Sequence, residues 1–116
     1  MSRRRAERVA EAVREVIAEL LLRDIKDPRI GMITLTTVEL TDDLRHAKVY
    51  FSSAGDDAAR QRSLHGLRSA AGYIRAQVTR RLQLRYAPEI SFLFDPGLEA
   101  ADRLSTLLRE ARPKDS

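Results

Sequence analysis

The segment LHGLRSAAGYIRAQVTRRLQLRYAPEISFLFD, residues 64–95, decides the fold and raises the question of function. Its apolar residues recur at spacings of three and four, which predicts a helix with one face on a core: Leu64, Leu67, Ala71, Ile74, Val78 and Leu82. The same segment carries two glycines, five arginines and only two acids. An interior glycine costs a helix about 1 kcal/mol relative to alanine. Something must offset that cost and the repulsion between the arginines.

The two glycines, Gly66 and Gly72, allow two interpretations. In the first, the helix presses on the sheet so closely that only glycine fits. In the second, the helix is kinked or broken, and a helix restarting at Gly72 offers free N–H groups and a positive dipole end to an anion. Arg75 lies about 100° beyond Ile74 on a helix. The apolar stripe can therefore face the sheet while most arginines face solvent, with Arg81 flanking the stripe.

Positive charge is concentrated in one part of this 116-residue chain of net charge +4. Residues 58–88 hold seven arginines and no acid, whereas the other residues hold 14 basic and 17 acidic side chains and sum to −3. Such asymmetry predicts a polyanionic partner. Eighteen of the 21 basic residues are arginine, which suits bidentate phosphate contacts. A GC-rich genome would also enrich arginine and is the alternative explanation.

The residues before this segment predict a helix and a β-hairpin. Residues 3–23 have helical periodicity, with Ser2 as a possible cap and Arg3, Arg4 and Arg5 in the first turn, where the helix dipole disfavours cations. These arginines form either a frayed terminus or a basic arm that meets phosphates. Residues 32–41 and 46–53 read as strands joined by a short turn, and the first needs a bulge near Thr36–Thr37 to keep its apolar residues on one face.

A third strand is expected in ISFLFD, residues 90–95, and a last short helix around Leu104, Leu107 and Leu108. The order is therefore α–β–β–α–(kink)–α–β, which predicts a single two-layer α+β domain with the helices on one face of a three-stranded sheet. We assign residues 1–110 to this domain and residues 111–116 to a disordered C-terminal tail.

Several functions are excluded by what the sequence lacks. It has no cysteine, its two histidines, His46 and His65, stand apart, and no nucleophile motif or glycine-rich phosphate loop occurs. We therefore expect no enzyme, no cofactor, no metal site and no small-molecule substrate. No apolar run is long enough to span a bilayer, so we expect a cytoplasmic protein.

Tyr50, Tyr73 and Tyr86 could stack on bases, Tyr73 foremost, or could simply pack half-buried.

The predicted order of elements and several motifs of the chain resemble a known family. The element order is that of a type II KH domain, which ordinarily has a GXXG loop between its two middle helices. Here Ala70-Ala71-Gly72 stands in its place, and this A-x-G step is the hallmark of the ribosome-binding factor A family. DPRIG at 27–31, the hairpin ITLTTVELTDDLRHAKVYFS at 33–52 and LRYAPEISFLFD at 84–95 are similar to the same family, so the resemblance covers residues 3–110.

The resemblance implies a protein of ribosome biogenesis that binds the free small (30S) ribosomal subunit and assists late 16S rRNA maturation, including 5′-end processing, notably in the cold. It implies RNA contact by Ala70, Ala71 and Gly72 and by the flanking Arg68 and Arg75. Our charge argument adds Arg80, Arg81, Arg85 and the N-terminal Arg3, Arg4 and Arg5. We expect a monomer, because one core uses all the apolar stripes.

Two other classes of function stay open on the residues alone. A DNA-binding module would prefer duplex DNA to ribosomal subunits. A protein-interaction adaptor would use the acidic face of the first helix, which carries Glu7, Glu11 and Glu15, and would keep its partner when the arginines are neutralised.

Overall fold

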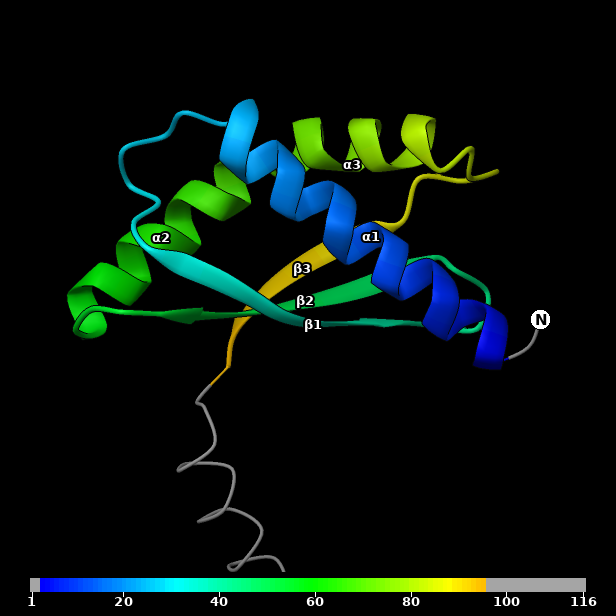
Figure 1. Cartoon of the computed structure of the whole chain (residues 1–116), viewed down its shortest axis with the longest axis horizontal. Helices are drawn as coiled ribbons and strands as arrows, with labels where there is room; N and C mark the ends of the chain where they lie inside the picture. The colour runs from blue at the N-terminus through cyan, green and yellow to red at the C-terminus, as the bar shows by residue number, and fades with distance from the viewer. Residues whose placement is uncertain (1–2, 96–116) are drawn as a thin grey trace, which may run out of the picture.

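The computed structural model describes residues 3–95. Its elements follow the predicted order and form an α+β fold of the type II KH-like arrangement (Figure 1): α1 Arg3–Arg23, β1 Ile33–Leu40, β2 His46–Ser53, α2 Asp57–Ser69, α3 Ala71–Arg81 and β3 Glu89–Phe94. The Ser2 cap, the helix predicted around Leu104, Leu107 and Leu108, and the tail at 111–116 lie outside the described residues.

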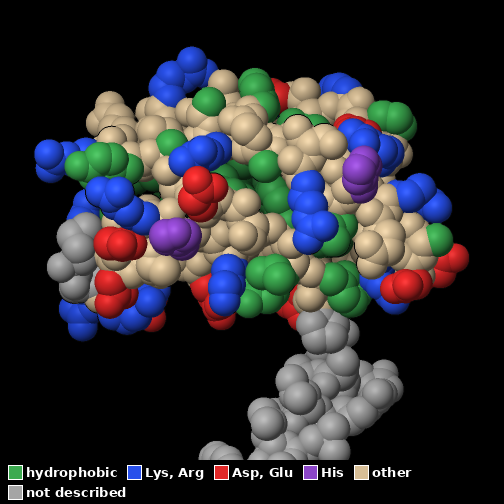
Figure 2. Space-filling model, turned by 180° about the vertical axis from the view of Figure 1, so that it is seen from behind, with side chains coloured by type: hydrophobic (Ala, Val, Ile, Leu, Met, Phe, Trp, Pro, Cys, Tyr) green, Lys and Arg blue, Asp and Glu red, His purple; other side chains and the backbone are tan. Residues whose placement is uncertain are grey.

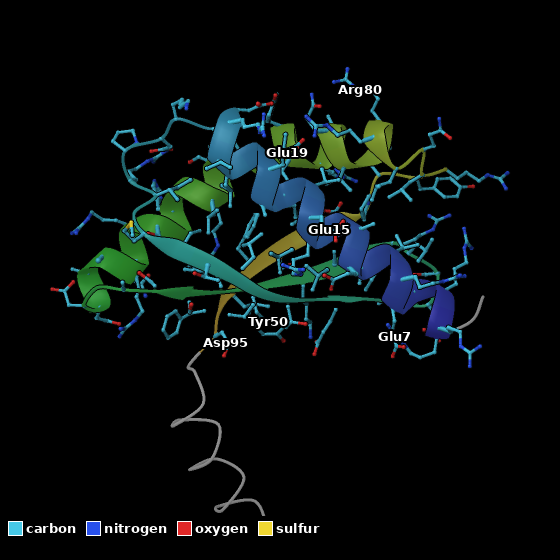
Figure 3. All side chains as sticks on the ribbon, in the orientation of Figure 1. Glu7, Glu15, Glu19, Tyr50, Arg80 and Asp95 are labelled. Carbon is cyan, nitrogen blue, oxygen red and sulfur yellow. The ribbon has the colours of Figure 1, made fainter. Side chains whose placement is uncertain are left out.

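The three strands form one mixed sheet in the order β1-β2-β3. β1 and β2 are an antiparallel hairpin, whereas β3 joins β2 in parallel after the two middle helices. All three helices lie on one side of this sheet (Figure 1), as the sequence predicted. The other face carries polar side chains, with Tyr50 and Asp95 on that side (Figure 3).

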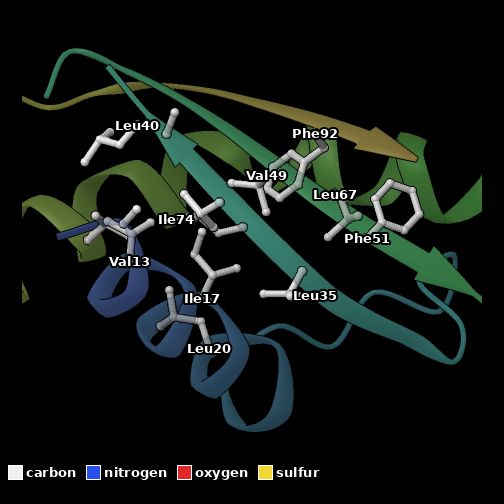
Figure 4. Packing of buried hydrophobic residues seen from close by; sticks show 14 of the residues in the cluster. Val13, Ile17, Leu20, Leu35, Leu40, Val49, Phe51, Leu67, Ile74 and Phe92 are labelled. Carbon is white, nitrogen blue, oxygen red and sulfur yellow. The ribbon is translucent and has the colours of Figure 1, made fainter. Parts of the chain in front are cut away.

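The core lies between the helices and the covered face of the sheet (Figure 4). Helix α1 contributes Val13, Ile17 and Leu20, and the strands contribute Phe51 and Phe92, all of them 2% exposed or less. The α2–α3 pair supplies the fully buried part of its predicted stripe, which is Leu67, Ile74 and Val78. The alternation of β3 would place Phe94 on the same inward face as Phe92, but Phe94 lies at the sheet end, 36% exposed, with its ring edge-on to Phe51.

The predicted bulge in β1 is present. Leu35 pairs with Phe51 and Thr37 with Tyr50, so Thr36 is the extra residue. Without it, Leu35 would face the core while Val38 and Leu40 faced solvent, because strand side chains alternate. With it, all three are buried.

Gly66 is explained by close packing. A Cβ atom at Gly66 would lie 2.7 Å from Ile30 Cγ1 and 3.3 Å from Arg29 Cβ, so the loop between α1 and β1 rests directly on α2. Buried Ser63, one turn before Gly66, accepts a 3.1 Å hydrogen bond from the Gly31 N–H. Close packing, the first interpretation, therefore explains Gly66, but the neighbour is the loop before β1 and not the sheet.

The same loop is held in shape by Asp27 and Arg29. The Arg29 backbone N–H donates to Asp27 Oδ1 at 2.9 Å, and its guanidinium donates to both carboxylate oxygens. These bonds stabilise the charged carboxylate, and they lower the pKa of Asp27 from 3.8 to about 2.

We expect Asp27 to contribute stability that is complete above pH 4 and is lost as the pH falls from about 4 toward 2, because a lowered pKa in the folded state favours folding only while the carboxylate is ionised. Asp27→Asn should therefore be less stable than the wild type at pH 7, and most of the difference should be gone when the pH reaches about 2. Thermal unfolding of both proteins from pH 2 to 7 measures this. A constant difference across that range would contradict it.

Candidate nucleic-acid interface

The break between α2 and α3 falls at Ala70. Its φ is −89°, and its ψ of −1° differs from the value of about −42° in a regular helix. This change in ψ bends the chain at the junction between α2 and α3. The Ala70 N–H is shared between the carbonyls of Gly66 and Leu67, both at 3.1 Å. No side chain caps the start of α3. The break was predicted, but α3 restarts at Ala71 rather than at Gly72, which is its second residue.

Gly72 differs from Gly66 because no other residue packs against the position that its side chain would occupy. A Cβ atom placed there would have no heavy atom within 4 Å, and the residue is exposed. Packing therefore does not explain this glycine. A bare backbone at an uncapped helix start can be approached closely by a ligand, and such helix starts favour anions. The structure thus gives the two glycines different explanations: Gly66 is packed against a neighbouring loop, and Gly72 is open to solvent. The sequence alone gave the same two alternatives for both.

Arg68 and Arg75 flank the A-x-G step but differ in their surroundings. Arg68 is exposed, and within the described chain its guanidinium has no hydrogen bond or ion pair. Arg75 instead donates from Nε to the Pro88 carbonyl at 3.0 Å and from Nη2 to the Ala87 carbonyl at 3.1 Å, with Glu89 at 3.4 Å. Arg75 thus fastens α3 to the segment that enters β3. Its assignment to RNA stays a prediction.

The arginines at the end of α3 also differ. Arg80 donates to Gln77 Oε1 at 2.8 Å and points away from the body of the molecule (Figure 3). Arg81 forms an ion pair with Glu19 of α1, so much of its charge is neutralised within the protein. Arg85 is exposed, with its guanidinium 5.6 Å from the centre of the Tyr86 ring.

The N-terminal arginines have separate roles as well. Arg3 donates to the Leu40 carbonyl at 2.7 Å and pairs with Asp42 at 3.2 Å, so it ties α1 to the β1–β2 turn. Arg4 is exposed and has no partner among residues 3–95. Arg5 lines a hollow beside Leu82 and Leu84. The start of α1 and the end of α3 lie at the same end of the molecule (Figure 1), which the sequence did not reveal.

Arg45 was missed by sequence reasoning, whereas Arg62 was counted among the seven arginines of residues 58–88 but was given no role. Arg45 in the β1–β2 turn lies 3.9 Å above the Tyr86 ring, and Arg62 on α2 is exposed with no partner in the part of the chain that the structure describes. The isolated arginine of the turn offered no signal, because its aromatic partner is 41 positions away. Figure 2 shows Lys and Arg side chains spread over the face seen from behind, around a region of apolar atoms.

The tyrosines are partly explained by packing. The Tyr73 hydroxyl donates to Asp24 Oδ2 at 2.8 Å, and this bond raises the pKa of Tyr73. The bond joins α3 to the end of α1, yet Tyr73 is 46% exposed. Tyr50 lies on the open sheet face near Glu39, and Tyr86 stacks on arginine. Base stacking by Tyr73 stays a prediction.

No cluster of three or more His, Cys, Asp or Glu side chains that could hold a metal ion occurs within residues 3–95. Over the same residues, every helix is too short or too polar to cross a membrane.

Comparison with known proteins gives one consistent family. The family model described as ribosome-binding factor A matches residues 5–108. The chain is 45% identical over 107 residues to ribosome-binding factor A of Geobacter metallireducens, covering 92% of this chain and 91% of the relative. It is 46% identical over 112 residues to that of Desulforamulus reducens, covering 97% and 93%.

Solved structures agree with these relatives. The crystal structure of ribosome-binding factor A from Thermus thermophilus has the same fold, with a TM-score of 0.66 at 24% identity over 76% of this chain and 93% of the other. The chain is also similar to a homology model of the Thermus thermophilus ribosome binding factor A fitted into a cryo-EM map of its complex with the 30S subunit. That likeness has a TM-score of 0.60 at 25% identity, over 75% of this chain and 91% of that one.

Proposed function

Because this chain belongs to the ribosome-binding factor A family, we propose that it binds the free small ribosomal subunit and assists its assembly. A relative of similar fold is known in complex with the 30S subunit, which supports the choice of partner. The observation that carries the proposal in this chain is the A-x-G step, with exposed Gly72 in open space and unpaired Arg68 beside it.

The arrangement suits RNA for electrostatic reasons. Exposed arginines without acidic partners cost the free protein self-repulsion, and phosphates of the rRNA relieve it by releasing counterions. The bare start of α3 allows a phosphate or sugar to approach the backbone, as KH domains do with their GXXG loop. We infer that residues 1–110 form the single RNA-binding domain, that it acts as a monomer without catalysis or cofactor, and that it works in the cytoplasm.

The finer role is late maturation of 16S rRNA, including processing of its 5′ end, with the greatest effect in the cold. The mechanism that fits a protein without catalysis is population shift, in which the protein holds one rRNA conformation by binding it better than the others. Chemical probing of 16S rRNA in immature subunits tests this step. Changed reactivity at discrete nucleotides is expected on adding the protein, and an identical pattern would contradict population shift.

Co-sedimentation tests the partner. Purified protein is centrifuged with isolated small subunits, large subunits and whole ribosomes, each at low and raised salt. We expect selective pelleting with small subunits that weakens as salt rises, because phosphate contacts are screened. Equal pelleting with every particle would reduce the interface to a generic basic surface. Preference for duplex DNA would favour a DNA-binding module, and binding that survives neutralised arginines would favour an adaptor.

A further inference from the structure

A hollow between the first half of α1 and the segment after α3 is lined by different kinds of residue from the two other hollows near the start of α1. It measures about 300 Å³, at the small end of ligand pockets, and it is lined by Arg5, Arg8, Val9, Ala12, Leu82 and Leu84. The four apolar residues form the floor, while both arginines are exposed. The hollow between α1 and β1 contains three glutamates, and the one at the β1–β2 turn contains two aspartates. This hollow has arginine and no acid.

The chain is bent to build the apolar floor. Gln83 has a left-handed φ of 52°, a conformation that residues other than glycine adopt at a cost. The turn is closed by a 3.0 Å hydrogen bond from the Leu84 N–H to the Thr79 carbonyl. As a result Leu82 and Leu84, two positions apart, both line the same hollow against α1.

Two arginines at this end of α1, Arg4 and Arg8, are unfavourable in the free protein. The first turn of α1 contains no acid, and cations there lie at the positive end of the helix dipole. Arg4 and Arg8 stand four residues apart on one helix face, where like charges repel. Neither has a hydrogen bond or ion pair from its guanidinium among residues 3–95. An anion at this end of α1 would reverse all of these costs.

We propose that this hollow holds one unpaired base of the bound RNA, with its phosphates on Arg8 and Arg4. This rests on the proposed function and extends it to a second contact point. An apolar floor under guanidinium groups matches a base with its charged backbone, because proteins hold unstacked bases on apolar, aromatic or guanidinium surfaces while cations track the phosphates. An α3 of 11 residues spans about 16 Å, so the RNA would be held at both ends of that helix.

The base itself is tested by NMR of the full chain, observing the methyl groups of Val9, Leu82 and Leu84. The probes are a uridine hexanucleotide and a hexamer of the same backbone without bases. We expect these methyl signals to shift with the uridine hexamer, through the ring currents of the base, and not with the abasic hexamer. Equal shifts with both, or none with either, would overturn the proposal.

The contribution to subunit binding is tested with two matched variants. Arg8→Gln and Arg62→Gln each remove one exposed, unpaired arginine from a helix, but Arg62 lies on α2, away from the hollow. We expect Arg8→Gln to weaken small-subunit binding by about tenfold, as the loss of a charge-assisted hydrogen bond does, and Arg62→Gln to weaken it clearly less. Equal losses of affinity in the two variants would mean that only the overall positive charge of the protein matters, and would overturn the proposed site.

The outcomes separate this proposal from the proposed function. If wild-type protein binds no small subunits while the uridine hexamer still shifts the methyl signals, the proposed function fails and the base site stands. If wild-type protein binds subunits but the methyl signals respond to the ribosomal proteins of the small subunit and not to the hexamer, the hollow is a protein contact and the base site is wrong.

Discussion

Replacing Arg68, Arg80 and Arg85 together by glutamine is expected to weaken binding to small subunits by about a thousandfold with little change in thermal stability. All three side chains are exposed, and none forms an ion pair with an acid of residues 3–95. A hydrogen bond to a charged group is worth about 1.5 kcal/mol or more, and each factor of ten in affinity takes about 1.4 kcal/mol. The slope of log affinity against log salt should also flatten by about 2–3.

Arg75 provides the matched control for that variant. Its guanidinium bonds two carbonyls of the segment before β3, and Pro88 is among the fully buried residues. Arg75→Gln should therefore lower the free energy of unfolding by about 1–3 kcal/mol, because it leaves those carbonyls without their donors. Its effect on binding should be smaller than that of the triple variant. Wild-type affinity in the triple variant, with affinity lost in Arg75→Gln, would contradict this division of roles.

The second large effect concerns the glycines. Gly66→Ala is expected to lower the free energy of unfolding by about 1–3 kcal/mol, because the new methyl group would lie within 3 Å of Ile30 and forces the loop away from α2. Gly72→Ala meets no neighbour and should raise stability by up to about 1 kcal/mol, since alanine favours helix over glycine.

The effects on small-subunit affinity should be the reverse of the effects on stability: Gly72→Ala should lose affinity, and Gly66→Ala should keep it. The methyl group of Gly72→Ala covers the backbone at the start of α3, so small-subunit affinity should fall although the protein is more stable. Gly66→Ala should bind normally at temperatures where it is folded. Thermal unfolding and subunit affinity of both variants test the pair. A destabilised Gly72→Ala that binds like wild type would mean that close packing explains both glycines.

Much of the fold follows from local pattern. Helix α1 at residues 3–23 and β2 at residues 46–53 match their predicted bounds, because long periodic runs and β-branched alternation are strong signals. The bulge at Thr36 was predictable since the alternation of β1 slips by one residue there. The break in the long helix could be placed only approximately, because the stripe continues unbroken across Ala70.

What the sequence could not show depends on contacts between distant segments. Nothing local distinguishes Gly66 from Gly72; the difference is the loop carrying Ile30, which is 36 positions from Gly66. The arginines likewise look equivalent in the sequence, yet Arg75, Arg81 and Arg3 are bonded within the fold, while Arg68 and Arg4 are not. Charge counting therefore predicts a basic surface but not which guanidinium groups are free to bind.

Contact between the A-x-G step and rRNA can be measured directly. The chain has no cysteine, so a single introduced cysteine is the only attachment point for a probe. Ser69→Cys places a tethered hydroxyl-radical source beside the break. Ser91→Cys is the matched control on the open sheet face, where Ser91 pairs with Lys48 and both are exposed. With bound small subunits, we expect cleavage of 16S rRNA at discrete sites from position 69 and little from position 91. Strong cleavage from position 91 alone would contradict the interface described here.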